Sequence, residues 1–227
     1  MANTKESVST GKIVNVFNNF LSANKKILII IGIVLVVALI ALWIGLSVSS
    51  AVAQKNQLAI DQLQISYDTW VALEDKNTAE AKASYDELVS ALSALAGKGG
   101  AKYPVLKAGY LLGLVHYTNG DYQNALNRFA DVAAKGSETY LAPLSLNNCG
   151  VTSELLGDTT KALEYYQKVY DTYGNDAAES AKALFSVARI HEANKEIELA
   201  KAVFQQLVDE FAASEYAKLA QSRLVLL

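Results

Sequence analysis

The sequence predicts an all-α protein in which one N-terminal transmembrane helix is followed by a solenoid of helical hairpins. Residues 27–46 form a run of 20 residues without a charged side chain. The chain beyond this run is rich in alanine and leucine, lacks alternating β-branched residues and repeats one pattern three times. These observations divide the chain into a cytoplasmic tail of residues 1–26, a transmembrane helix of residues 27–46 and a repeat domain of residues 47–227.

The tail has two interpretations. Ile13, Phe17, Phe20 and Leu21 follow helical spacing, so a short helix could lie in the membrane interface with Lys25 and its neighbour near the headgroups. A disordered tail of ordinary composition is equally compatible with these residues.

The apolar run has the length of a membrane span. At about 1.5 Å per residue its 20 residues extend roughly 30 Å, the hydrocarbon thickness of a bilayer. Four lysines and one glutamate precede the run, whereas the first basic residue after it is Lys55. This bias predicts a cytoplasmic N-terminus and a C-terminal domain outside the cytoplasm, anchored in the inner membrane.

A cleaved secretory signal is the competing interpretation of the same run. Residues 51–53 read Ala-Val-Ala, a pattern at which a signal peptidase could cut before Gln54. The hydrophobic region of a signal usually has about 7 to 15 residues, so the longer run favours an uncleaved anchor. No cysteine stands at the end of the run, which excludes a lipoprotein.

The composition of the repeat domain limits its function. Residues 47–227 carry 16 basic and 22 acidic side chains, and the resulting net charge of −6 argues against binding to nucleic acid. The single cysteine, Cys149, permits no internal disulfide. Pro104 and Pro143, the only prolines, stand where helices are expected to begin.

Three segments, residues 111–133, 148–170 and 186–208, share one pattern of small and aromatic residues. Small residues recur at intervals of 37 and 38, an aromatic residue follows each by four, and Gly-Asp marks the first two turns. The recurring small and aromatic residues are Ala125, Ala162, Ala200, Phe129, Tyr166 and Phe204. A small residue allows two helices to cross closely, and the aromatic side chain fills the adjoining groove. Each segment therefore predicts a helix, a turn and a second helix, stacked on its neighbours.

This pattern resembles the tetratricopeptide repeat. Leu112-Gly113, Gly120-Asp121, Ala125 and Phe129 carry the resemblance in the first segment. In the second segment Gly150, Gly157-Asp158, Ala162 and Tyr166 match the pattern. The third segment keeps Ala188, Ala200 and Phe204 but replaces Gly-Asp with Lys-Glu at residues 195–196. A degenerate earlier unit is expected around Trp70, Ala81, Tyr85 and Leu88, and a last helix over residues 214–226 is expected to cap the array. The domain would then hold three to four repeats and a capping helix.

A short cytoplasmic tail, one anchor and an exported repeat domain together resemble the ancillary subunit of the bacterial Sec translocon. That resemblance implies a position beside the translocation channel and transfer of exported chains to chaperones. It is one of architecture more than of residues, so it bears on fold and topology more than on partner.

We find no constellation of residues in the sequence that supports catalysis, a metal site or a cofactor. His116 and His191 are the only histidines, and they fall at equivalent positions two repeats apart, too distant to share one ion. Packing is the expected role of both, as it is of Cys149. The glycine-rich segment 97–100 lacks the spacing and hydroxyl of a phosphate-binding loop and predicts a flexible connector.

The resemblance to tetratricopeptide domains implies a concave partner-binding groove along the first helix of each repeat. Mixed aromatic, amide and charged side chains there suit an extended or helical peptide, with Asn147 able to hold its backbone. Carrying the positions over gives Lys107, Tyr110, Tyr117, Asn147, Glu154, Phe185, Arg189 and Glu192, with Leu114, Leu144 and Val151 between them.

The sequence therefore predicts a non-catalytic, membrane-anchored periplasmic scaffold that binds proteins during export or envelope assembly. The expected partners are translocon subunits, chaperones or exported chains. The alternative is a structural, self-associating protein that links the inner membrane to an envelope complex. Ala41 and Gly45 have the spacing at which membrane helices pair, so a homo-oligomer stays open.

Overall fold

The computed structural model describes residues 15–227, and every regular element in that range is helical, as predicted. The chain divides into two units, Met1–Lys55 and Asn56–Leu227. The predicted tail lies partly outside the described residues, which exclude Lys5 and Lys12. Residues 15–23 are helical and precede the long helix α2, Lys25–Val71.

The apolar run lies within α2, which has no break over its 47 residues. By length and composition it is the one helix among the described residues that could cross a membrane. Residues 51–53, the possible cleavage site, lie inside this helix. From Asn56 onward α2 belongs to the second unit.

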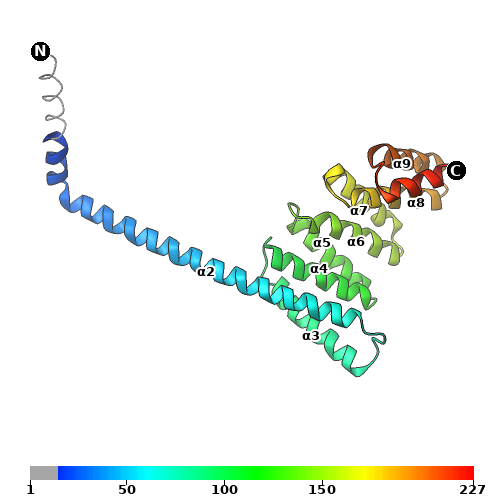
Figure 1. Ribbon diagram of the computed structural model, residues 1–227, viewed down its shortest axis with the longest axis horizontal. Coiled ribbons are helices and arrows are strands. Elements are labelled where there is room, and N and C mark those ends of the chain that lie inside the picture. Colours follow the sequence, from blue (N-terminus) through cyan, green and yellow to red (C-terminus); the bar gives the residue numbers. More distant parts are fainter. Residues whose placement is uncertain (1–14) are drawn as a thin grey trace, which may run out of the picture. The chain divides into compact units, whose positions relative to one another are not determined.

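The second unit is a stack of antiparallel helix pairs that follow one another in chain order (Figure 1). The end of α2 pairs with α3 through a hydrogen bond from Trp70 and a shared apolar cluster. The later hairpins are α4 with α5, α6 with α7 and α8 with α9. Helix α10 packs against α8 and α9 and closes the C-terminal end of the stack. The bounds are α3 Ala79–Ala96, α4 Tyr103–Thr118, α5 Tyr122–Lys135, α6 Leu141–Leu155, α7 Thr159–Tyr173, α8 Ser180–Ala193, α9 Ile197–Glu210 and α10 Glu215–Leu224, with a short 3₁₀ turn at Gly174–Asp176.

The small and aromatic residues of the repeat form the contact between the two helices of each hairpin. All six are buried, with at most 1% of the residue exposed. A side chain at Gly113 would place its Cβ 2.6 Å from the Phe129 ring, and a Cβ at Gly150 would overlap the Tyr166 ring. Glycine is therefore required by the closeness of the aromatic ring, since neither position needs an unusual backbone conformation.

The turns within the hairpins are built as the sequence predicts in the first two repeats. Gly120 and Gly157 adopt φ values of 79° and 80°, and the following Asp121 and Asp158 accept hydrogen bonds from backbone N–H groups of the next helix. In the third repeat Lys195 takes the same left-handed conformation, with φ 64°. The third turn thus keeps the backbone of the other two without the residue that favours it.

The predicted degenerate first unit is present as the hairpin of α2 and α3. Trp70 is 2% exposed and donates from Nε1 to the carbonyl of Ala81 at 3.2 Å, which ties the end of α2 to the start of α3. Trp70 and Leu88 share one apolar cluster with residues of α4, so this hairpin is part of the stack. The predicted capping helix is α10, whose Ser214 caps its N-terminus.

Candidate interaction groove

The first helices of the first three hairpins, α2, α4 and α6, enclose a cavity of about 260 Å³. Three tyrosines dominate its lining, together with leucines, one amide and one ammonium group. We call this cavity the tyrosine groove, and its residues are Gln64, Tyr67, Lys107, Tyr110, Leu111, Leu114, Tyr140, Leu141 and Leu144.

Tyr110 is fixed in the tyrosine groove by contacts on two sides. Its ring packs against Phe129 with 5.7 Å between centroids, and its hydroxyl accepts a hydrogen bond of 3.1 Å from Asn148 Nδ2. Burial raises the pKa of Tyr110 and that of Tyr67, so both phenols are neutral at physiological pH. The Tyr110 O–H proton is free to be donated to an acceptor, such as a peptide carbonyl.

A second group of aromatic residues forms the rim of the groove. The hydroxyls of Tyr103 and Tyr140 are hydrogen-bonded at 3.0 Å, and the Lys107 ammonium lies 5.9 Å from the centre of the Tyr103 ring. Tyr140 is 60% exposed. No carboxylate within residues 15–227 forms an ion pair with Lys107. The rim therefore offers one uncompensated positive charge and one exposed aromatic ring.

Further along the stack, charged residues from successive hairpins pair with each other. Arg189 Nη2 donates to both carboxylate oxygens of Glu154 at 2.7 Å, and Glu154 also accepts from the Tyr166 hydroxyl at 2.8 Å. Burial and this carboxylate raise the pKa of Tyr166. One repeat later, Arg223 of α10 pairs with Glu192 of α8. We call these four residues, Glu154, Arg189, Glu192 and Arg223, the ion-pair region.

The structure thus separates the eight residues predicted to line one groove. Lys107 and Tyr110 line the tyrosine groove. Glu154, Arg189 and Glu192 belong to the ion-pair region. The remaining three, which are Tyr117, Asn147 and Phe185, line no part of the tyrosine groove.

Asn147, which was expected to hold a peptide backbone, is not accessible to a ligand in this conformation. Asn147 is 1% exposed, and its Nδ2 donates to the Glu179 carbonyl at 3.1 Å. The amide therefore joins α6 to the residue before α8. It is buried because its position on α6 faces the following hairpin.

Tyr117 and Phe185 take part in packing. Tyr117 is half-buried and meets Tyr122 of its own hairpin edge-on, with centroids 5.8 Å apart. Phe185 lies between Phe204 and Tyr216, at centroid distances of 5.6 Å and 5.9 Å. Its role is to join the last hairpin to the capping helix.

Five residues of the tyrosine groove were not predicted from the sequence: Gln64, Tyr67, Leu111, Tyr140 and Leu141. Gln64 and Tyr67 belong to α2. This helix was expected to form part of a degenerate repeat, and no groove residue was predicted on it. Tyr140 lies one residue before α6, in the connection from α5. Aligning α2 with the first helices of the later repeats would have found the first two.

The histidines and the cysteine lie in separate packing environments. His116 Nδ1 is 3.3 Å from the Tyr85 hydroxyl and 3.4 Å from Asp121, and burial lowers the pKa of His116. His191 pairs with Glu196 at 2.6 Å. Cys149 is fully buried, and burial raises the pKa of its thiol to about 12. Such a thiol is a poor nucleophile.

Comparison with known proteins identifies the repeats. The family model described as tetratricopeptide repeat matches residues 110–177 and 156–215. One similar solved structure is a crystal structure of nearly identical TPR-like repeats from Podosopora anserina, in a chain named as a kinesin light chain. It superposes on this chain with a TM-score of 0.54. It shares 16% sequence identity, over 73% of this chain and 84% of that one.

A second structure of the same repeats gives a TM-score of 0.53 at the same identity and coverage, whereas no curated protein matches the sequence. Residues 110–215 are therefore tetratricopeptide repeats, and the solved structures support the solenoid fold alone.

Proposed function

We propose that this tetratricopeptide-repeat protein is a non-catalytic scaffold, anchored in the inner membrane, whose tyrosine groove binds a segment of another protein. The observation that carries the proposal is the groove itself, in which Lys107 has no carboxylate partner among the described residues and Tyr140 stays exposed. Tetratricopeptide repeats are modules of protein–protein interaction, so a protein ligand is the general expectation.

The chemistry of the groove defines the segment that would fit. Leucines and tyrosines favour an apolar or aromatic side chain as the anchor, since such anchors supply most of the energy of a peptide interface. The Tyr110 hydroxyl can donate to a backbone carbonyl, and Lys107 attracts an acidic group beside the anchor. A short segment with an apolar residue next to a carboxylate combines these features.

The anchor and the compartment are inferred from α2 and its flanks. The apolar run of residues 27–46 lies inside this helix, and lysines precede it, so the tail would be cytoplasmic and the solenoid outside the cytoplasm. In that compartment the available ligands are exported chains, chaperones and envelope proteins. A role in protein export, as in ancillary subunits of the Sec translocon, follows from this placement.

The environment of the reactive residues supports a non-catalytic role. The Cys149 thiol is buried with its pKa raised to about 12, and each histidine contacts an acidic residue of its own hairpin. None of these groups lines the tyrosine groove.

Site-specific photocrosslinking in cells tests the binding site. A photoreactive phenylalanine analogue at position 107 or 140 is expected to trap translocon subunits, chaperones or exported chains. The matched control places the analogue at position 189, where Arg189 is already paired with Glu154. Absence of adducts from both groove positions, or equal adducts from position 189, would contradict the groove as binding site.

A reporter fused after Leu227 tests the topology separately. An enzyme that is active only outside the cytoplasm is expected to be active at this position, and the full-length protein is expected to fractionate with the inner membrane. An inactive reporter, or a soluble mature protein that begins at Gln54, would contradict the anchored topology.

A further inference from the structure

The two ends of the solenoid differ in how they are closed. At the C-terminal end α10 covers the last hairpin, and its Ala217 and Ala220 are buried against it. At the other end, a pocket of about 320 Å³ lies on the first hairpin and is lined by residues of α2, of α3 and of their connection, with no residue from any other helix of residues 56–227. The first hairpin therefore keeps open a surface on which the solenoid elsewhere packs a further helix.

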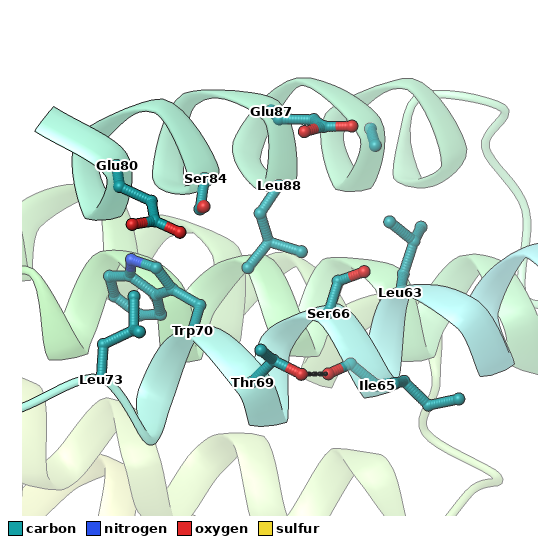
Figure 2. A pocket seen from close by; sticks show the side chains of 11 residues that line it. Leu63, Ile65, Ser66, Thr69, Trp70, Leu73, Glu80, Ser84, Glu87 and Leu88 are labelled. Carbon is teal, nitrogen blue, oxygen red and sulfur yellow. Dashed lines mark hydrogen bonds between the residues drawn. The ribbon is translucent and has the colours of Figure 1, made fainter.

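The pocket has an apolar base and an acidic wall (Figure 2). Leu88 points from α3 into the space between the helices, and the Glu80 carboxylate lies above the Trp70 indole. We call the pocket the first-hairpin pocket, and its residues are Leu63, Ile65, Ser66, Thr69, Trp70, Leu73, Glu80, Ser84, Glu87, Leu88 and Ala91.

The exposed residues of this pocket are one apolar residue (Ile65), two hydroxyl residues (Ser66 and Thr69) and two acidic residues (Glu80 and Glu87). Ile65 is 66% exposed, and Leu58, one heptad earlier on the same face of α2, is 60% exposed. Glu80 and Glu87 are both exposed and form ion pairs with no residue of the described chain. The exposed side chain of Ile65 thus lies on a surface that also carries two free carboxylates.

The charge of the first hairpin selects among possible occupants. Residues 56–96 contain seven acidic and two basic side chains, a net charge of −5, whereas the whole chain carries −3. Two copies meeting through this surface would bring like charges together, which disfavours self-association. A basic partner is attracted by the same charges.

We propose that the first-hairpin pocket binds a basic amphipathic helix of another protein, which continues the helical stack at its open end. On α3 the pocket extends from Glu80 to Ala91, about 16 Å or three helical turns. The carboxylates of Glu80 and Glu87 are two turns apart, so a partner helix with lysine or arginine at positions i and i+7 matches them. Leucine or isoleucine on the adjoining face would contact Ile65 and Leu63.

The pocket is independent of the tyrosine groove, with which it shares no residue. Either site could therefore be occupied while the other is empty, and the failure of one proposal leaves the other intact.

Energy transfer from Trp70 gives a direct test with the full-length protein in nanodiscs of neutral phosphatidylcholine. Trp43→Phe leaves Trp70 as the only tryptophan, since the chain has two. The probe is an 18-residue helical peptide of leucine and lysine, with a dansyl acceptor at one end, and the matched probe replaces lysine with glutamate. We expect saturable transfer with the lysine peptide alone.

Charge-neutralising variants provide the decisive comparison. Glu80→Gln combined with Glu87→Gln is expected to weaken binding about three- to tenfold, because two exposed charge contacts are lost. Glu164→Gln combined with Asp171→Asn removes two exposed carboxylates from α7 and is expected to change binding less than twofold. Circular dichroism checks that each variant keeps its helices.

Two results would overturn the proposal. The first is equal binding of the lysine and glutamate peptides, or equal loss in the two double variants. The second is rapid disulfide dimerisation of an Ile65→Cys variant that excludes the lysine peptide, because a second copy would then be the occupant of this surface.

Discussion

The tyrosine groove lies on α2, α4 and the start of α6, whereas the ion-pair region lies on α6, α8 and the capping helix α10, and the two differ in how their polar groups are used. In the ion-pair region Glu154 and Arg189 satisfy each other across two hairpins, and Arg223 of the capping helix does the same for Glu192. In the tyrosine groove Lys107 lies over an aromatic ring and has no carboxylate partner in the described chain. A charged residue at a concave position therefore joins repeats in one region and is free for a ligand in the other.

The largest expected effect concerns the stability of the ion-pair region. Gly150→Ala places a methyl group against the Tyr166 ring, which is held by its hydrogen bond to Glu154. We expect a loss of about 2 kcal/mol in the free energy of unfolding, the usual cost of overpacking a core. Urea denaturation of the full-length protein in mild detergent measures it.

Gly45→Ala is the control for this variant, since an added Cβ there meets no atom within 4 Å. An unchanged unfolding midpoint in Gly150→Ala would show that the ring can move without cost, and that Glu154 is held less firmly than the geometry indicates.

The second prediction concerns binding in the tyrosine groove. Lys107→Glu reverses the one free charge of the rim, and we expect photocrosslinking from position 140 to fall about tenfold, equivalent to about 1.4 kcal/mol of binding energy. Arg189→Glu is the matched charge reversal in the ion-pair region and is expected to leave these adducts unchanged. Equal losses in both variants would indicate general damage to the solenoid.

The third prediction compares the stability of one variant in the ion-pair region with that of one variant in the tyrosine groove. Arg189→Met leaves Glu154 without its ion pair, in a side chain that is 24% exposed, and should cost about 1 kcal/mol of unfolding free energy. Lys107→Met removes no ion pair and should cost less than about 0.5 kcal/mol. Thermal unfolding of both variants, followed by circular dichroism, separates them. A larger loss in Lys107→Met would assign Lys107 a structural role.

The repeat pattern was sufficient to predict the hairpins but not the pairing of side chains between them. The alanine and aromatic positions are local to each hairpin, so their spacing alone predicted buried contacts such as that of Ala125 within its hairpin. Partners such as Glu154 and Arg189 are 35 residues apart. Whether they meet depends on the rotation from one hairpin to the next, which no local pattern encodes.

The same reason explains why the burial of Asn147 and the place of Tyr140 in the groove could not be predicted from the sequence. A position carried over from a repeat pattern specifies a face of one helix, whereas exposure depends on the neighbouring hairpin. The start of α8 covers Asn147, and the connection before α6 leaves Tyr140 exposed at the rim of the groove. Connections vary between repeats, so their contribution to a groove is the least predictable part of the fold.

The smallest effect concerns the third turn, where the ion-pair region meets the last hairpin. Lys195 adopts φ 64°, a conformation that costs a residue with a side chain about 1 kcal/mol relative to glycine. Lys195→Gly is therefore expected to raise the unfolding free energy by about 0.5 to 1 kcal/mol, and Gly157→Lys to lower it by a similar amount at the equivalent turn. Chemical denaturation of the two reciprocal variants measures both changes against the wild type. A loss of stability in Lys195→Gly would mean that the lysine side chain contributes more to this turn than its backbone conformation costs.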